Sequence, residues 1–354
     1  MTPLFNKIHL KFRLNGINYD REGLKEVAYS LVKEGESYER VTGNFLLDWL
    51  DDKDFVLVKT SGSTGVQKTI KLKKQAMVNS AIMTGDFFKL KPGDTALHCL
   101  PSQYIAGKMM LVRAMILGLE LDMVAPSSMP AYQHLKPYDF CAMIPLQLKK
   151  SLGQLMQIKT LIVGGASVSN SLKEELKGLD TRVFETYGMT ETVSHIAVRC
   201  LNFTSEKGAH FQILKDIKIH ADNRGCLVIE AKQLTDDIIT TNDVVDVVSK
   251  SEFDIIGRFD NMINSGGVKL FPELIEAKLS DNIKSRFFIT SEPDKDLGQK
   301  VVLVLEGDSK TFNKDVFGGL SKFEIPKKVY HTTKFIETET GKLQRQKTFK
   351  SIIK

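Results

Sequence analysis

The strongest local signal in the chain is the apolar run Phe55-Val56-Leu57-Val58, which leads into Thr60-Ser61-Gly62-Ser63-Thr64-Gly65-Val66-Gln67-Lys68-Thr69. A short apolar run that ends in glycines and hydroxyl side chains is typical of a buried strand followed by a phosphate-binding loop. The glycines let successive backbone N–H groups point into one concavity, while the hydroxyls and Lys68 add donors and positive charge. The stretch therefore predicts a site for a phosphorylated ligand.

A P-loop NTPase is one interpretation of this loop, since that class reads GxxxxGK followed by Ser or Thr. Gly62 and Lys68-Thr69 fit the spacing, but Gln67 stands where the pattern requires a second glycine. The backbone must wrap the β-phosphate at that glycine, so Gln67 argues against this class.

The segments around the loop alternate between strand and helix patterns, which predicts an α/β sheet with parallel pairing. Strand-like runs follow at Asp94–Leu100, Phe140–Ile144, Thr160–Val163 and Thr181–Thr186. Helical patterns lie at Glu22–Lys33, Val41–Leu50, Gln75–Lys89, Lys108–Leu117 and Ser171–Leu179. At the N-terminus, Lys7–Leu14 alternates strictly between polar and apolar residues, and Asn15-Gly16 supplies a hairpin turn, so a half-exposed strand is expected there.

The pattern of predicted elements changes after about residue 205. From there only short strands are expected, at Phe211–Ile219, Cys226–Glu230, Asp243–Val248 and Asp254–Ile256. A second α/β segment follows, with a helix at Pro272–Leu279 and strands near Phe287–Thr290 and Val301–Leu305. A boundary between Gly257 and Asn261 separates the short strands from this second α/β segment. We therefore expect domains at residues 1–257 and 261–354.

Composition is that of an ordinary globular protein: of 354 residues, 42% are hydrophobic and 26% charged, which excludes wholesale disorder and collagen-like structure. No apolar run approaches the ~18 residues that a membrane-spanning helix needs, and the N-terminus does not resemble an export signal, so a cytoplasmic location is expected. The four cysteines and seven histidines are scattered. Their spacing favours reduced thiols over a disulfide framework or a zinc site.

The net charge of +6 is concentrated at the end of the chain, where residues 261–354 hold 17 Lys and Arg against 12 Asp and Glu. A basic end can attract nucleic acid, anionic lipid or a phosphorylated small molecule, or can simply be a solvated surface. No aromatic-interleaved basic stripe supports nucleic acid, so no nucleic-acid partner is expected.

Five further motifs follow the loop, and together the six resemble those of the adenylate-forming superfamily, which comprises acyl- and aryl-CoA ligases, peptide-synthetase adenylation domains and luciferase. In chain order they are Leu161-Ile162-Val163-Gly164-Gly165-Ala166, Tyr187-Gly188-Met189-Thr190-Glu191-Thr192, Thr241-Asn242-Asp243, the segment Gly257–Glu276, and Thr340-Gly341-Lys342-Leu343-Gln344-Arg345. The resemblance implies a large N-terminal domain of α/β sheets plus a short β region, followed by a small mobile α+β C-terminal domain with a hinge at about 258–260.

The resemblance also implies a role for each motif residue. Phosphates would be held by Thr60, Ser61, Gly62, Ser63, Thr64, Gly65 and Lys68. Gly164, Gly165, Ala166, Tyr187 and Gly188 would meet the adenine, and Asp243 and Arg258 the ribose. Thr190 would contact the phosphate and the acyl carboxylate, Glu191 would help to hold Mg²⁺, and Lys342 would be the mobile catalytic lysine. Asp260 would be the hinge residue, and Gly266 and Gly267 would meet the pantetheine arm of CoA.

Three departures from the superfamily pattern stand out. Asn242 replaces the usual Gly beside Asp243, and Tyr104 in Pro101–Gly107 occupies the position of a common His. Relatives also carry far more than 59 residues before the phosphate loop, which implies an abbreviated N-terminal part.

The implied reaction uses ATP, Mg²⁺ and coenzyme A: an acid is first joined to AMP and then transferred to CoA. Among the members of the adenylate-forming superfamily, the chain most resembles the compact o-succinylbenzoate–CoA ligases of menaquinone synthesis. That acid has a second carboxylate, for which Lys108, Arg113, Tyr104 and His195 are candidate partners. The alternatives are another small aryl- or acyl-CoA ligase, a carrier-loading adenylation domain, or a non-catalytic relative that binds nucleotide or acyl-CoA. The presence of Glu191 and Lys342 argues against the last.

Overall fold

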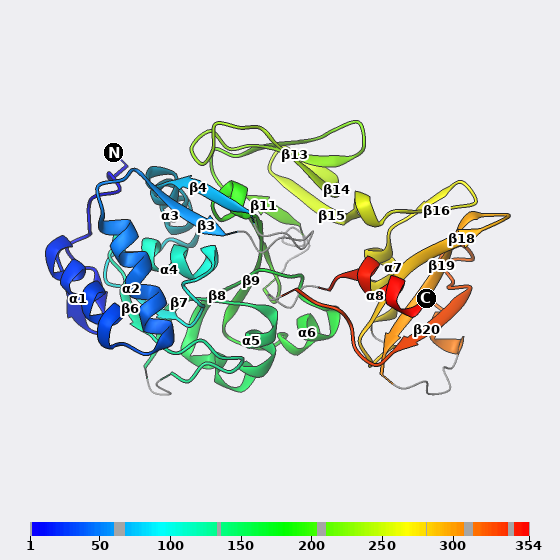
Figure 1. Cartoon of the computed structure of the whole chain (residues 1–354), viewed down its shortest axis with the longest axis horizontal. Helices are drawn as coiled ribbons and strands as arrows, with labels where there is room; N and C mark the ends of the chain where they lie inside the picture. The colour runs from blue at the N-terminus through cyan, green and yellow to red at the C-terminus, as the bar shows by residue number, and fades with distance from the viewer. Residues whose placement is uncertain are drawn as a thin grey trace.

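Five parallel strands form the centre of the molecule, as the alternation of strand and helix patterns predicts (Figure 1). The computed structural model describes residues 2–59, 68–132, 136–203, 210–280, 282–307, 314–338 and 343–353. The parallel strands are β5 (Thr95–His98), β6 (Glu120–Met123), β7 (Tyr138–Met143), β8 (Ile158–Val163) and β9 (Arg182–Gly188). They lie in the order β6-β5-β7-β8-β9.

Helices cover both faces of the parallel strands, because neighbouring strand residues point to opposite sides. Ala96, Phe140 and Phe184 pack into one buried cluster with α1 (Arg21–Glu34), α2 (Ser37–Leu50), α3 (Lys74–Phe88) and α4 (Ile105–Leu117). Their chain neighbours Leu97, Cys141 and Val183 pack on the other face with α5 (Pro145–Lys150) and α6 (Asn170–Glu175). None of the described helices is long and apolar enough to cross a membrane.

Further strands extend the sheet on both sides, to 13 strands within the described residues. Beyond β9 lie β10 (His195–Cys200), β11 (Phe211–Ile213), β15 (Glu252–Arg258), β14 (Ile239–Ser249), β13 (Cys226–Glu230) and β12 (Lys218–Ala221). At the other edge β1 (Arg13–Leu14) pairs in parallel with β6, and β2 (Ile17–Asn18) closes a hairpin on β1. A separate hairpin joins β3 (Phe55–Lys59) to β4 (Thr69–Lys73).

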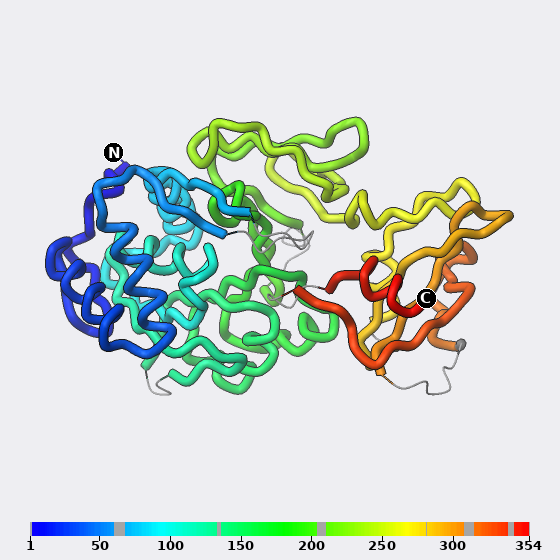
Figure 2. Tube along the Cα trace, viewed as in Figure 1, coloured from blue at the N-terminus to red at the C-terminus, as the bar shows by residue number. Residues whose placement is uncertain are grey.

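The chain beyond residue 262 builds a second sheet, which lies at the right of Figure 2. Its elements are β16 (Ile263–Ser265), β17 (Val268–Leu270), α7 (Pro272–Leu279), β18 (Phe287–Asp294), β19 (Gly298–Glu306), β20 (Lys328–Thr332) and α8 (Arg345–Ile352). Its two buried clusters draw only on residues from Ile263 onward, whereas the clusters of the first sheet end at Phe253. The predicted domain boundary at 257–261 falls between them and stays a prediction.

Two strand predictions near the N-terminus need correction. Only Arg13–Leu14 of the predicted strand Lys7–Leu14 is a paired strand. The His9 N–H donates to Met115 O on α4, and the Phe12 N–H donates to His9 O, which closes a turn in place of a strand. The run Phe55–Val58 is a strand, but it is buried on one face only: it lies in a two-stranded hairpin in which Val56 and Val58 are buried whereas Leu57 is 59% exposed.

Three further elements differ from the predictions. The run Phe211–Ile219 is two strands, because Asp216 takes a left-handed conformation (φ 63°) between them. The helix expected to reach Leu179 ends at Glu175, before Gly178 (φ 83°). Strand β6 was not predicted, since its four residues Glu-Leu-Asp-Met are too few to form a recognisable pattern.

A buried chain of side chains fixes the end of β5 against α2. His98 Nε2 lies 3.0 Å from Ser102 Oγ, which lies 2.9 Å from Thr42 Oγ1. His98 Nδ1 has no partner among the described residues. Burial lowers the pKa of His98 from 6.5 to about 4, so the imidazole is neutral at pH 7.

This histidine should make the protein less stable in mild acid. Between pH 6.5 and about 4 the unfolded chain binds a proton at His98 while the folded chain does not, so the free energy of unfolding falls as the pH falls. From pH 7.5 to 5.0 the loss attributable to His98 should be about 2 kcal/mol. The loss should be absent in His98→Gln, and urea denaturation of both proteins at the two pH values measures it.

His220→Gln, a change at an exposed histidine on β12, is the matched control and should keep the wild-type pH dependence. An identical pH dependence in wild type and His98→Gln would contradict the account of His98.

Candidate active site

The carboxyl ends of the parallel strands open onto one cavity of about 580 Å³. Residues directly after β5, β7, β8 and β9 line it, namely Leu100, Ile144, Gly164 and Met189. Ligands of α/β proteins bind outside the carboxyl ends of the strands, where loops and backbone donors gather. The topology therefore marks this cavity as the candidate active site.

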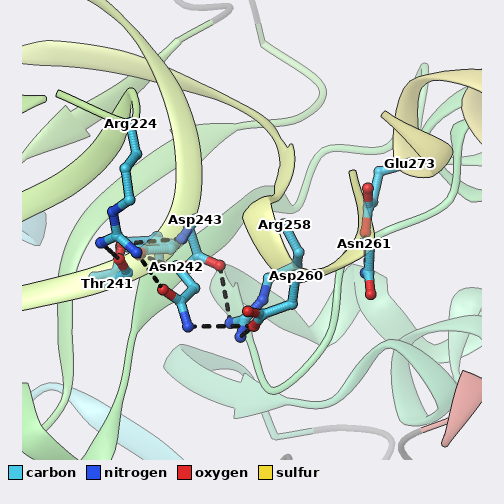
Figure 3. Close-up of polar contacts among 9 residues, drawn as sticks. Arg224, Thr241, Asn242, Asp243, Arg258, Asp260, Asn261 and Glu273 are labelled. Carbon is cyan, nitrogen blue, oxygen red and sulfur yellow. Dashed lines mark hydrogen bonds and ion pairs between the residues drawn. The ribbon is translucent and has the colours of Figure 1, made fainter. Parts of the chain in front are cut away.

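A hydrogen-bonded cluster forms one side of the cavity (Figure 3). The Tyr187 hydroxyl at the end of β9 donates to Asp243 Oδ2 at 2.6 Å, and Arg258 Nη1 donates to Asp243 Oδ1 at 3.1 Å. The Tyr187 ring packs edge-on against Phe253 and Phe211. The cluster thus presents an aromatic ring, a carboxylate and a guanidinium to one space, a combination suited to a base and its sugar.

Electrostatics keep this cluster in one protonation state at neutral pH. Burial and the neighbouring Asp243 carboxylate both raise the pKa of Tyr187, so its hydroxyl stays a donor. Burial tends to lower the pKa of Arg258, but Asp243 and Asp260 outweigh that effect and raise it. Arg258 is therefore a permanent cation beside the cavity.

The turn after β9 brings the next motif residues to the cavity. A side chain on Gly188 would clash with the backbone of Ser194 and His195, so only glycine allows the turn to fold back. Val193 takes a left-handed φ of 65°, a strained conformation for a β-branched residue. Thr192 Oγ1 braces the turn by donating to Ser194 O at 2.8 Å.

Thr190, Glu191 and Lys68 line the same cavity. Glu191 and Lys68 are exposed, and Thr190 is half-buried. Glu191 and Asp243 are the acidic residues among those described around the cavity. One exposed carboxylate fits Mg²⁺, which takes one or two protein carboxylates and completes its shell with phosphate oxygens and water.

The glycines after β8 also lie where they were predicted. Gly164 and Gly165 line the cavity, and Gly165 has a left-handed φ of 87°. A side chain on Gly164 would meet Thr186 Oγ1. Ala166 comes next and is exposed, outside the cavity lining.

A buried arginine also lines the cavity. Arg113 on α4 is 2% exposed, and its Nη2 donates to Ser194 Oγ at 2.7 Å. Its Nε donates to Thr84 Oγ1 of α3 at 3.2 Å, and its Nη2 lies 3.5 Å from His195 Nδ1. The arginine is therefore fixed by two hydroxyls and an imidazole.

No carboxylate in the described part of the chain forms an ion pair with Arg113. Burial lowers the pKa of its guanidinium to about 9, which still leaves a cation at pH 7. Burial and the nearby Arg113 together hold the pKa of His195 well below its usual 6.5, so that imidazole is neutral. A buried cation without a counter-ion is costly, which makes this wall a candidate binding site for an anion.

Two of the predicted substrate residues do not line the cavity. Lys108 lies five residues before Arg113, which turns it ~140° away around the helix. Its ammonium lies 4.6 Å from the centre of the Phe45 ring, and burial lowers its pKa. Tyr104 lies at the N-terminal end of α4, half-buried and outside the cavity lining.

Other predicted site residues lie elsewhere. Gly266 and Gly267 form the turn between β16 and β17, with φ of 61° and 83°, away from the cavity lining. Asp260 lies in a short 3-10 helix, Phe259–Asn261, where its carboxylate accepts from Arg258 Nη2 at 3.0 Å. Thr60, Ser61, Gly62, Ser63, Thr64, Gly65 and Lys342 lie outside the described residues, so their roles stay predictions.

Sequence reasoning missed Ser194 and Thr84, the two hydroxyls that hold Arg113. Ser194 had a usable signal, since it lies two residues after the motif Tyr187–Thr192 and directly before His195. Helical spacing would also have paired Arg113 with Met109, four residues earlier and in the cavity wall, rather than with Lys108. Thr84 carries no signal, because its contact depends on the packing of α3 against α4.

Comparison with known proteins agrees with this geometry. Residues 30–212 match the family model described as AMP-binding enzyme. The 2-succinylbenzoate–CoA ligase of Escherichia coli is 24% identical over 326 residues, covering 84% of this chain and 71% of that enzyme.

Solved structures extend the comparison to the whole fold. An acyl-CoA synthetase (AMP-forming)/AMP-acid ligase II-like protein from Dyadobacter fermentans is 35% identical, with a TM-score of 0.62 over 93% of this chain and 98% of that one. The o-succinylbenzoate CoA synthetase of Bacillus subtilis, in complex with the intermediate OSB-AMP, shares the fold at 20% identity, with a TM-score of 0.71 over 82% and 68%. Because the family model matches more than half of the sequence, the chain belongs to the AMP-binding enzyme family.

Proposed function

We propose that the protein is an AMP-forming acid–CoA ligase and that its acid is the dicarboxylate o-succinylbenzoate, as in menaquinone synthesis. The observation that carries the proposal is that two kinds of residue line one cavity. Tyr187, Asp243 and Arg258 are suited to a nucleoside, and the buried Arg113 has no carboxylate partner among the described residues.

The relatives support this substrate. The E. coli relative is named for 2-succinylbenzoate. The B. subtilis enzyme is seen with the acyl-adenylate OSB-AMP in one structure and with ATP and a magnesium ion in another. These relatives support a cavity that accepts both a nucleotide and an anionic group of the acid.

In the first half-reaction, a carboxylate oxygen of the acid attacks the α-phosphorus of ATP. The bond from that phosphorus to the bridging oxygen breaks, and pyrophosphate leaves with the electron pair. Thr190 and Lys68 face the reacting phosphates from the cavity wall, while Lys342 and the loop of residues 60–65 are proposed to add cationic and backbone donors. Magnesium, which Glu191 would help to hold, supplies charge neutralisation for the phosphate oxygens.

In the second half-reaction, the CoA thiolate attacks the acyl carbonyl, and AMP leaves with the electrons of the acyl–phosphate bond. The chain needs no nucleophile of its own for this step, because the adenylate already carries a good leaving group. We propose that a rotation at Asp260 removes Lys342 and brings Gly266 and Gly267 to the cavity. Such use of one site for two steps requires a mobile connection.

A pyrophosphate-release screen over carboxylic acids, with and without CoA, tests the proposal. We expect pyrophosphate release with o-succinylbenzoate and ATP. Multiple turnover and a thioester product should appear only when CoA is added. Binding of ATP without release for any acid would favour the non-catalytic alternative. Release with a fatty acid or benzoate in preference to o-succinylbenzoate would leave a ligase but overturn its substrate.

Arg113→Ala should lower kcat/KM for o-succinylbenzoate by roughly 30-fold or more, because the second carboxylate loses a buried, charged partner. Benzoate, which lacks that carboxylate, should lose little beyond its already low rate. Steady-state kinetics with both acids measure the difference.

Lys108→Ala is the matched control, since it removes a mostly buried cation from the same helix but outside the cavity. Equal losses for both acids in Arg113→Ala, or equal discrimination in the Lys108 variant, would show that Arg113 does not anchor the substrate.

Lys342→Ala should slow adenylate formation by roughly 10²–10³, the usual effect of removing one preorganised charge from a developing anion. Thioester formation from a preformed acyl-adenylate should be spared, because the proposed rotation removes Lys342 before that step. Single-turnover assays of each half-reaction separate the two, and equal loss in both would contradict the assignment.

A further inference from the structure

The register of two strands brings the nucleotide carboxylate next to the linker. β14 and β15 pair antiparallel with Asp243 opposite Arg258. Asn242 therefore lies beside the residues that follow β15, the short 3-10 helix Phe259–Asn261. These residues connect the two buried apolar clusters: Phe253 is the last residue of the cluster on the first sheet, and Ile263 is the first residue of the cluster on the second.

Two bonds from this region meet at one oxygen of the linker (Figure 3). Asp260 Oδ2 accepts from Arg258 Nη2 at 3.0 Å and from Asn242 Nδ2 at 3.2 Å. Arg258 also binds Asp243 through its Nη1 at 3.1 Å. One connection from Asp260 to β14 therefore runs through the nucleotide carboxylate, and the other does not.

The amide of Asn242 is oriented by a neighbouring arginine. Arg224 Nη1 donates to Asn242 Oδ1 at 3.1 Å, and Arg224 Nη2 donates to Thr241 O at 3.2 Å. Arg224 is itself held by Asp222 Oδ2, which accepts from its Nε at 2.9 Å. Because a guanidinium only donates, the amide oxygen must face Arg224 and the NH₂ must face Asp260.

This position needs a side chain that accepts on one side and donates on the other. Asparagine does both. Aspartate would place a second carboxylate against Asp260, and glycine would leave Arg224 and Asp260 unconnected. The residue that departs from the superfamily pattern is thus the one that connects β14 to the linker.

We propose that Asn242 is a positioning residue that holds Asp260 to β14 independently of Asp243. When ribose hydroxyls take the Asp243 carboxylate, Arg258 must share that carboxylate with the ligand and can turn toward the ligand. The Asn242 bond does not involve that carboxylate and persists. Asn242 thereby limits how freely the linker reorients while nucleotide is bound; the consequence for turnover rests on the proposed ligase function, whereas the linker geometry does not.

Hydrogen–deuterium exchange of the full chain, read on peptides that cover residues 258–263, tests this proposal. The Met262 N–H, which donates to Phe259 O at 3.2 Å, reports opening of the short helix. In Asn242→Gly, exchange should be roughly 3- to 10-fold faster, the effect of one partly exposed hydrogen bond to a charged acceptor. Asn242→Asp should exchange faster still, since it adds repulsion against Asp260.

Saturating AMP provides the sharper arm. Because AMP diverts Arg258, the difference between wild type and Asn242→Gly should grow when AMP is added. Asn79→Ala is the matched control. It removes the hydrogen bond of 2.8 Å that Asn79 Nδ2 donates to Gln233 O, away from the linker, and the linker should exchange as in wild type. Equal melting temperatures in all variants confirm that the effect is local.

Unchanged linker exchange in both Asn242 variants, with and without AMP, would overturn the proposal. An exchange difference that AMP does not enlarge would overturn the independence of the two connections. Failure of the ligase proposal is distinguishable: no acid would then release pyrophosphate, while the exchange result would stand by itself. As the readout for a positioning role, the ratio of the two half-reaction rates should change about threefold or more in Asn242→Gly with KM for ATP unchanged, and an equal decrease of both rates would contradict it.

Discussion

The Asp243 carboxylate is the contact on which the site depends, because it connects the end of the parallel strands to the strand pair that leads into the linker. Tyr187 reaches it from the end of the parallel strands, Arg258 reaches it from the strand that enters the linker, and Asp243 itself lies on the antiparallel extension of the sheet. A ligand that takes this carboxylate must change contacts on both sides. With Asp243 as the proposed ribose acceptor, nucleotide binding and linker geometry would be coupled by shared hydrogen bonds rather than by a long pathway.

The burial of Arg113 in the cavity wall costs free energy, which the binding of an anionic substrate would offset. Arg113 is buried with hydroxyl and imidazole partners but without a carboxylate among the described residues, and Val193 holds a strained backbone where the turn delivers Ser194. Proteins keep such features where function requires them, at the expense of stability. A bound carboxylate would supply the missing charge, which is how the proposed ligase would select a dicarboxylate over a simple aromatic acid.

Much of the fold was predictable because it depends on local patterns. The strands β5, β7, β8 and β9 and the helices α1, α2, α3 and α7 follow from apolar periodicity and from Gly and Pro at their ends. Tyr187, Asp243, Arg258 and the glycines after β8 were predicted by motif, and the structure brings them to one cavity. The failures depend on tertiary contacts: the segment Lys7–Phe12 is bent by a bond to α4, Lys108 faces Phe45 rather than the cavity, and the role of Asn242 arises only when two strands fix its distance from Asp260.

The most direct test of this account is the affinity for AMP and for 2′,3′-dideoxy-AMP, measured by isothermal titration calorimetry in wild type and in Asp243→Ala. If Asp243 accepts from ribose hydroxyls, wild type should bind AMP roughly 10- to 100-fold more tightly than the dideoxy analogue, the usual value of hydrogen bonds to a charged group. Asp243→Ala should bind the two nucleotides almost equally. The same preference for AMP in both proteins would contradict the account, since the ribose would then be recognised elsewhere.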